Sequence, residues 1–528
     1  MSRNARYLLF AALCVGVFLV GVELLVTAVA LPFIVADLAD WTRLREASWI
    51  INGYLVAYVA VMPLAGRAAD RHSLPNLFAG SLALFAIGSI TAGAAQSLEW
   101  LIGARVVQGL GAGAIVPLAT AGASHLFDGS TRARALGVVG ALTFLGMAAG
   151  PFLGAAVLQG VQLTEPALLA PAWRWIFYLG APLALLGAIY TWAAAPAWPR
   201  ATTAAGLDLL GAALFTSAVA TGLVAITSVG QAEPAMVGAL ALAAVVSLGL
   251  ALIRFATAPA PFLDLRHFAD RTFSGAVLLS LLTGYGLATA IIGGAVFIDR
   301  VRYAGPGEQQ LALGGLALAM ALGALGSGFV LRRTGVVVLS LIGLALSIAG
   351  LLWLSTASVQ TELASIVGGL SAFGFGFGLT VTARSSAAVE ALGRSAFGVA
   401  SAGVTVARML GMGIGLAALT VLGSNRIQAL SLVLIDQQAR DAVLPPNLQG
   451  RPLEDYLVVN ALEAWAANQA ATILSTLFVV AAIVTAVAIV PTLAMRNRPS
   501  VSSGAEPREH REGVSDGVEQ ASQAGIAI

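Results

Sequence analysis

Three charged side chains interrupt stretches of the sequence that are otherwise apolar. Glu23 is the single charged residue between positions 8 and 35, and Arg105 and Arg408 break similar runs later in the chain. A carboxylate near the middle of a bilayer costs about 2.5 kcal/mol or more, and such residues usually face a cavity and handle protons, ions or substrate. Glu23 is therefore a candidate proton or substrate site, and the alternative is a structural acid satisfied by a neighbouring helix.

The arginines differ in depth. Arg105 is close to the external end of its apolar run, so a side chain that reaches back to the interface is an alternative to a buried role. Arg408 lies near the middle of its run and must pair, reach water or bind an anionic group. For Arg384, near the cytoplasmic end of another run, a structural or interfacial role is at least as well supported.

Other kinds of chemistry find little support. The chain has no lysine, which excludes a Walker-type nucleotide site, and its one cysteine, Cys14, lies in the first apolar run. The four histidines fall in loops or the C-terminal tail and do not cluster. We expect no enzyme activity, no metal and no cofactor, and the formal net charge of +2 points to no nucleic-acid partner.

The elements that must position these residues are membrane-spanning helices. Of 528 residues, 58% are hydrophobic and 10% are charged, whereas soluble proteins carry about 25% charged residues. The composition predicts an all-α, multi-pass membrane protein, and we expect it to lie in a bacterial plasma (inner) membrane. Apolar runs of about 20 residues predict fourteen transmembrane helices, near 8–35, 48–66, 76–96, 100–124, 134–159, 173–195, 206–229, 234–256, 272–298, 308–331, 335–357, 362–386, 396–424 and 463–494.

Arginine placement and a weak internal repeat organise these helices. Arginines are more numerous on the side of the N-terminus, which predicts that both termini are cytoplasmic. GRAADRHS follows the second helix, GFVLRRTG follows the tenth, and both fit one pattern of glycine and charge. We expect two six-helix bundles, 1–200 and 261–498, separated by two extra helices in 201–260. The second bundle includes an external extension at 425–460, and residues 499–528 form a disordered cytoplasmic tail.

Four motifs resemble those of a known family. They are ELLVTAVALP around Glu23, GRAADRHSLP in the loop after the second helix, LIGARVVQGLGAG around Arg105, and GMAAGPFLGA in the fifth helix. On these residues the chain resembles the major facilitator superfamily, and within it the fourteen-helix drug:proton antiporters. It departs where Glu23 replaces the usual Asp, where Ser73 replaces a Gly, and where Leu74 and Pro75 replace basic residues.

The resemblance implies roles for particular positions. It places Glu23 and Arg105 in a proton-coupling cavity, and Arg408 is a further candidate for it. It makes the loop residues Gly66, Asp70 and Arg71 a conformational motif, in which an Asp such as Asp70 caps a helix of the opposite bundle. The antiporter motif of the fifth helix holds four more conformational residues, Gly146, Gly150, Pro151 and Gly154.

A narrower resemblance concerns the second half. VARMLGMGIGLAAL, an arginine soon after it at Arg426, and the long external extension are similar to the mycobacterial triacylglyceride exporters. In that case the extension guides lipid toward the periplasmic side, and Arg426 contributes to an external ion lock. Asp299 and Arg300, at the outer end of the ninth helix, are a further candidate gate pair or simply interfacial charges.

These expectations define a proton-coupled exporter of hydrophobic or amphiphilic molecules that works by alternating access. Its energy source is the proton gradient, and its surroundings are membrane lipids. The alternative is a lipid transporter that moves triacylglyceride toward the periplasmic side, with an external lipid-carrier protein as partner. A non-transporting sensor or scaffold is a more remote alternative. We expect the chain to act as a monomer.

Overall fold

The computed structural model describes residues 3–38, 47, 49–164, 171–194, 208–229, 232–259, 261, 263–304, 306–393 and 396–496. The chain divides into two units, Met1–Asn497 and Arg498–Ile528. The second unit, and with it the predicted tail, lies outside the described residues. Every regular element of the described part is a helix.

The first six long helices come from the first 194 residues. They are α1 (Arg3–Leu38), α3 (Trp49–Ala69), α4 (Leu74–Gly93), α5 (Leu98–Leu126), α6 (Gly129–Thr164) and α7 (Ala172–Ala194). Near one end of this set, Asp37 of α1 accepts a hydrogen bond from the Trp173 indole, 3.1 Å away. Arg174 adds an ion pair to Asp37 at 3.5 Å and donates to the Gly93 carbonyl at the end of α4. These contacts fix the ends of α1, α4 and α7 together.

Two further helices precede the second half, α8 (Leu209–Ser228) and α9 (Pro234–Thr257). Asp208 caps α8 through the Gly211 amide and pairs with Arg254 of α9 at 3.1 Å. In the apolar window of α9 only 6% of residues are buried, compared with 72% in α5. Since Leu242, Val245 and Ile253 are exposed, this helix presents an apolar face outward, as expected for contact with lipid tails.

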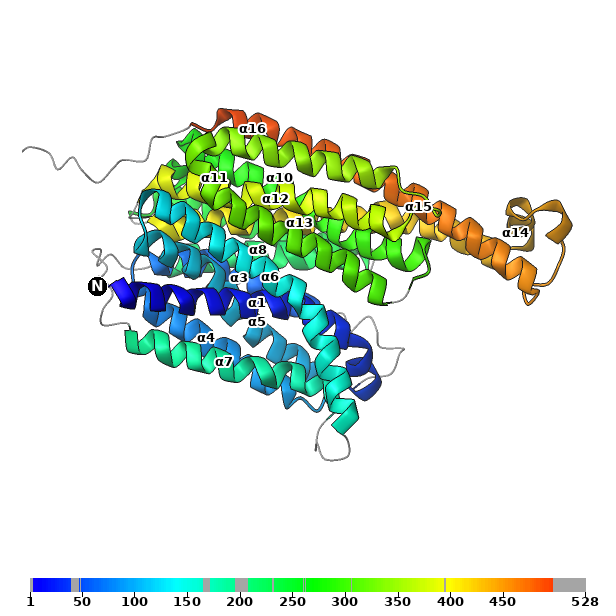
Figure 1. Cartoon of the computed structure of the whole chain (residues 1–528), viewed down its shortest axis with the longest axis horizontal. Helices are drawn as coiled ribbons and strands as arrows, with labels where there is room; N and C mark the ends of the chain where they lie inside the picture. The colour runs from blue at the N-terminus through cyan, green and yellow to red at the C-terminus, as the bar shows by residue number, and fades with distance from the viewer. Residues whose placement is uncertain are drawn as a thin grey trace, which may run out of the picture. The chain divides into compact units, whose positions relative to one another are not determined.

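The second half contains α10 (Arg271–Val296), α11 (Pro306–Ser355), α12 (Leu363–Leu392), α13 (Phe397–Ile435), α15 (Tyr456–Val487) and α16 (Ile489–Ala494). Short elements connect them: η3 (Leu265–Ala269), the π-helical η4 (Phe297–Val301), α14 (Gln437–Val443) and η6 (Pro446–Leu448). The two halves meet where α6 packs on α11 and where α3 packs on α13 (Figure 1).

Helix α11 consists of two arms that turn at one residue. Gly335 has φ 76° and ψ 167°, a backbone conformation that costs an L side chain energy. A Cβ at Gly323 would meet Phe375, and one at Gly343 would meet Gly376, so both arms lie on the same part of α12. The prediction of a loop between the tenth and eleventh helices is therefore wrong in detail. A single glycine replaces the loop because its positive φ lets the chain reverse at once.

Twelve helices of the described part are long and apolar enough to cross a membrane. The number twelve counts the two arms of α11 once and leaves out α8, whose apolar part, Leu210–Ile226, is shorter. The described chain is thus a multi-pass membrane protein, and the number of fourteen crossings and the cytoplasmic termini stay predictions.

The predicted external extension is formed by the ends of two long helices and α14. Figure 1 shows α14 at the far end of α15. The extension has a small apolar core that includes Val433, Leu444, Leu448, Val458 and Leu462. The thirteenth apolar run ends near residue 424, but α13 continues beyond it to Ile435. Asp436 is extended there and caps α14 through the Gln438 amide at 3.0 Å, which starts a separate helix.

Candidate functional site

The structure pairs Glu23 of α1 with Arg105 of α5. Both side chains are buried, with exposed fractions of 4% and 1%, and the guanidinium Nη1 donates to the carboxylate Oε1. Arg105 therefore does not reach back to the interface. A buried charge pair is tolerable only when its remaining donors and acceptors are satisfied, so the surrounding polar groups decide what the pair can do.

Polar side chains from three helices complete the pair. Thr27, one turn along α1, donates to Glu23 Oε1 at 3.2 Å, and Arg105 donates to the Gln108 side-chain oxygen at 2.6 Å. The Gln108 amide then donates to Ser89 of α4 at 3.0 Å, and Ser89 donates to the Phe177 carbonyl of α7. The pair thus belongs to a hydrogen-bonded chain that extends from α1 to α7.

Two further contacts fix the guanidinium of Arg105. Its Nε donates to the Ile50 carbonyl at 3.2 Å, and its Cζ lies 4.2 Å from the centre of the Tyr54 ring on α3. A cation stacked on an aromatic face gains about 0.5–2 kcal/mol, more when it is desolvated. Arg105 is therefore held on several sides, and Glu23 is the partner that a single proton can change.

Arg408 does not join the Glu23–Arg105 pair. It lies on α13 near Tyr58 of α3 and near Arg384 of α12, each within electrostatic range. Arg384 is 2% exposed and donates to the Thr283 hydroxyl on α10 at 2.5 Å, so an interfacial position for it is excluded. The charged residues at membrane depth thus form two groups. One is the ion pair of Glu23 and Arg105, and the other consists of the two arginines Arg384 and Arg408.

The antiporter-like motif of α6 packs directly against α1 beside Glu23. A Cβ at Gly146 would overlap the Phe18 carbonyl oxygen, and one at Gly150 would lie 2.6 Å from the Val22 carbonyl oxygen. Pro151 and Gly154 are buried in the same helix. Close backbone contact of this kind needs small residues, and it couples any movement of α6 to the segment of α1 that carries Glu23.

The loop motif after α3 contacts the start of α13. Asp70 accepts from the Gly398 amide at 2.7 Å and the Val399 amide at 3.0 Å, so a carboxylate of the first half caps a helix of the second. Gly66 allows this approach, because a Cβ there would overlap the Gly398 carbonyl oxygen. Burial raises the pKa of Asp70 to about 7, although the two amides, Arg67 and Arg71 favour the charged form.

The remaining predicted site residues lie elsewhere. Asp299 and Arg300 form an ion pair with each other at 2.9 Å, and both are largely exposed. They are neighbours on one element, so the pair does not itself bridge the two halves. The Arg426 side chain lies outside the described residues, although its backbone belongs to α13.

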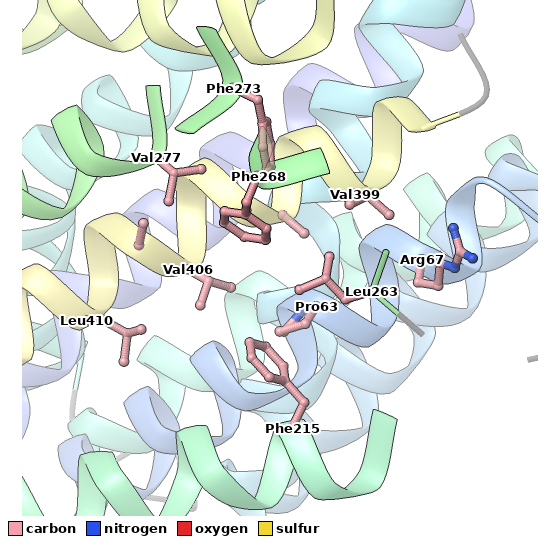
Figure 2. Close-up of a pocket in the computed structure, with 13 residues that line it drawn as sticks. Pro63, Arg67, Phe215, Leu263, Phe268, Phe273, Val277, Val399, Val406 and Leu410 are labelled. Carbon is pink, nitrogen blue, oxygen red and sulfur yellow. The ribbon is translucent and has the colours of Figure 1, made fainter. Parts of the chain in front are cut away.

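An apolar pocket of about 190 Å³ lies between α3, α8, α10 and α13. Its lining includes Pro63, Phe215, Phe273 and Leu410. Figure 2 shows the Arg67 side chain at one end of the lining residues. Arg67 donates to the Pro261 carbonyl at 3.1 Å. The pocket combines residues of both halves and suits a hydrocarbon chain.

Several functional contacts are not predicted by the sequence. Thr27 lies one turn after Glu23, a spacing that places both on one helix face and could have indicated their contact. Ser89 is one of several hydroxyl residues in α4, and nothing in its neighbourhood distinguishes it from a packing residue. Gln108 lies one turn after Arg105, a spacing that places both on one helix face and could have indicated their contact. In the described part, no group of three or more His, Cys, Asp or Glu residues could hold a metal ion.

Comparisons with known proteins agree with this architecture. The family model described as Major Facilitator Superfamily matches residues 13–416. A triacylglyceride transporter of Mycolicibacterium smegmatis is 30% identical over 473 residues, covering 85% of this chain and 81% of the relative. One of Mycobacterium tuberculosis (strain H37Rv) is 29% identical over 429 residues, covering 77% and 79%.

Solved structures share the fold at low identity. A bacterial homologue of the human lysosomal transporter Spinster, inward-facing and unoccupied, has a TM-score of 0.57 at 18% identity, covering 95% of this chain and 100% of that chain. The proton:xylose symporter XylE with 6-bromo-6-deoxy-D-glucose has a TM-score of 0.58 at 14% identity, covering 92% and 95%.

Proposed function

Since this chain belongs to the Major Facilitator Superfamily, we propose that it is a proton-coupled exporter of lipids that works by alternating access in a bacterial inner membrane. The observation that carries this proposal is the buried Glu23–Arg105 pair. A transporter that couples to protons needs a titratable group whose charge changes the balance between two conformations, and Glu23 meets this requirement.

Protonation of Glu23 provides the coupling step. It neutralises the carboxylate and leaves the Arg105 guanidinium buried without a counter-charge. Removing one partner of a buried pair costs about 3–5 kcal/mol, which corresponds to more than a hundredfold shift in a conformational equilibrium. The arrangement that keeps Arg105 buried is then disfavoured, and α1 moves relative to α5.

The movement reaches the rest of the bundle through two contacts. The glycines of α6 lie on α1 beside Glu23, so displacement of α1 is transmitted to α6 and from there to α11. On the other side, the Asp70 cap on α13 joins the halves and must break when the protein opens there. Glu23 binds a proton from the outside and releases it inside, while the substrate travels in the opposite direction.

Lipid is the substrate that fits the observations best. Relatives that share about 30% of their residues with this chain are named triacylglyceride transporters. The apolar pocket between the halves suits acyl chains, and the extension beyond the bundle offers a surface for delivering lipid at the periplasmic side, where an external carrier protein would accept it. Drug-like hydrophobic molecules are the second substrate class, favoured by the antiporter-type glycines of α6. The chain acts as a monomer with no cofactor besides the proton gradient.

Transport by purified protein in proteoliposomes tests the proposal. We expect that an imposed pH gradient drives movement of labelled triacylglyceride, and that the Glu23→Gln variant loses this dependence while it keeps its melting temperature. Glu463→Gln, an exposed acid of α15, serves as the matched control and should behave as the parent. Unchanged gradient-driven transport in Glu23→Gln would remove the carrier role. Complete absence of substrate-dependent proton flux in the parent protein would favour a sensor or scaffold.

A further inference from the structure

Two arginines of the second half, the buried Arg384 and the half-buried Arg408, have no acidic partner among the described residues. Arg384 is 2% exposed, and its Nη2 has no hydrogen-bond partner, while the Nε of Arg408 is likewise buried and unpartnered. The Arg384 guanidinium donates a hydrogen bond to a neutral hydroxyl, that of Thr283. Each guanidinium carries five donors, so both have unused capacity for an anion.

The helices that surround the two arginines carry almost no carboxylate. Within α10, α13 and the apolar part of α11 there is no Asp or Glu, and in α12 the only acid is Glu390, near its end. Arg132 of α6 lies within electrostatic range of Glu390. Glu23, the remaining membrane-depth acid, is already paired with Arg105. The described interior of the second half therefore carries two positive charges and no matching negative one.

The two arginines lie at similar depth and on converging helices. At 1.5 Å per residue, Arg408 is about 16 Å from the start of α13 at Phe397, and Arg384 is about 12 Å from the end of α12 at Leu392. α10 brings them together, because Thr283 accepts from Arg384 and a Cβ at Gly284 would meet the Arg408 backbone. Two like charges held this close repel each other, and an anion between them removes the repulsion.

The chemistry of the guanidinium group indicates the kind of ligand. Guanidinium groups bind phosphate and carboxylate through paired, charge-assisted hydrogen bonds that are about twice as strong as neutral ones. The apolar pocket is lined by Val406, Ala407 and Leu410 on another face of α13, and Arg384, Arg408 and Thr283 are not part of its lining. Two guanidinium groups without an acidic partner at membrane depth therefore match a lipid with an anionic head.

We propose that Arg384, Arg408 and Thr283 form a binding site for the anionic headgroup of an amphiphilic lipid. The inference rests on the proposed function and refines its substrate class, from neutral lipid to a lipid that carries a phosphate or carboxylate. Thr283 orients the Arg384 guanidinium and leaves its Nη2 directed to the ligand. Neutralisation by the headgroup removes the cost of two unpaired charges, which rewards the correct ligand over a neutral one.

Native mass spectrometry of the full-length protein in detergent tests this site. The probes are oleoyl lysophosphatidic acid and monoolein, which share the oleoyl glycerol and differ by the phosphate. We expect the phosphate-bearing lipid to bind at least tenfold more tightly, and expect Arg384→Gln and Arg408→Gln each to remove most of that preference. Arg408→Lys should restore part of it, and Arg266→Gln, an arginine outside the bundle with 89% of its side chain exposed, should leave it unchanged.

Each outcome decides between alternatives. Equal binding of the two lipids, or an intact preference in variants that remain monodisperse with the parent melting temperature, overturns the site. Displacement of the bound lipid by an equal concentration of inorganic phosphate assigns the arginines to a free anion and also overturns the proposal. Binding in detergent needs no proton gradient. If proton-coupled export fails while the protein still prefers the phosphate-bearing lipid, the result contradicts the proposed function but not this site.

Discussion

The contact between Asp70 and the start of α13 should make closure of this face depend on pH. Burial raises the pKa of Asp70 to about 7 in the closed contact, whereas separation of the halves returns the carboxyl to water and to its ordinary value near 3.8. The closed state therefore binds a proton more tightly than the open state. Closure is favoured at low pH, and this contribution is lost as the pH rises through about 7.

The size of the effect follows from the shift. Each pH unit between the two pKa values changes the free energy of closure by about 1.4 kcal/mol. Between pH 5.5 and 7 the change is about 1.6 kcal/mol, or roughly a 15-fold change in the ratio of closed to open molecules, because the carboxyl of the closed state is already half ionised at pH 7. Residues 397–399 of α13 carry no titratable side chain, but the His125 ring of α5 lies 5.0 Å from the Phe397 ring, so the comparison with Asp70→Asn is what isolates the contribution of Asp70.

Double electron-electron resonance can measure the two populations. Spin labels are placed at His72→Cys and Arg333→Cys, which are exposed positions in the first and second halves, in a Cys14→Ser background. The parent should shift toward the longer distance as the pH rises, and Asp70→Asn should show no such shift. Asp70→Ala leaves the Gly398 and Val399 amides uncapped, which costs about 1–3 kcal/mol, so it should favour the longer distance at every pH.

A pH dependence that is the same in Asp70→Asn as in the parent would refute this reasoning. The titrating group would then lie elsewhere, and the cap on α13 would be a fixed structural contact. Identical distances in the parent and Asp70→Ala would go further, since they would show that the cap does not hold the two halves together.

Two other predictions concern the α1–α6 contact and the extension. Gly146→Ala forces a methyl group against the Phe18 carbonyl and should cost about 1–3 kcal/mol of stability, which would appear as a lower melting temperature and slower transport. Gly103→Ala places its methyl group in open space and should change neither quantity. Equal effects of the two variants would contradict a role for the close contact. Replacing residues 436–451 by a short Gly/Ser linker should reduce export of triacylglyceride more than efflux of a small cationic dye, because only a lipid needs the path beyond the membrane, and equal losses would count against that path.

Much of this architecture is predictable because the bilayer restricts the chain to few solutions. A helix that satisfies its own backbone is the form that long apolar runs take, so the runs predict most of the observed helices to within a few residues. Charges at membrane depth are costly, and Glu23 and Arg105 are therefore found by their cost alone. The contact between Asp70 and α13 is foreseen from the motif, since an acid beside a helix start acts as a cap.

Other features depend on geometry that the sequence does not encode locally. The distance of Arg384 from the end of its apolar run resembles that of an interfacial arginine, and only the packing of α10 against α12 shows that the side chain points inward to Thr283. The exact place of the reversal in α11 is equally hidden: the apolar runs indicate a break between residues 331 and 335, and only the positive φ of Gly335 shows which residue makes the turn. Ser89 becomes informative once the partner of its hydroxyl is known.

The depth of the Glu23–Arg105 pair bears on how a transport cycle would respond to membrane voltage. About 30 Å of helix separates Glu23 from the start of α1 and about 22 Å separates it from the end of α1 at Leu38, whereas Arg105 lies only about 10 Å from the start of α5. Under the proposed function, a proton therefore crosses part of the electric field before it binds Glu23 and part after it leaves. At about 2.3 kcal/mol per charge for 100 mV, the electrical work is divided between the two steps. Both proton uptake and proton release should then respond to voltage.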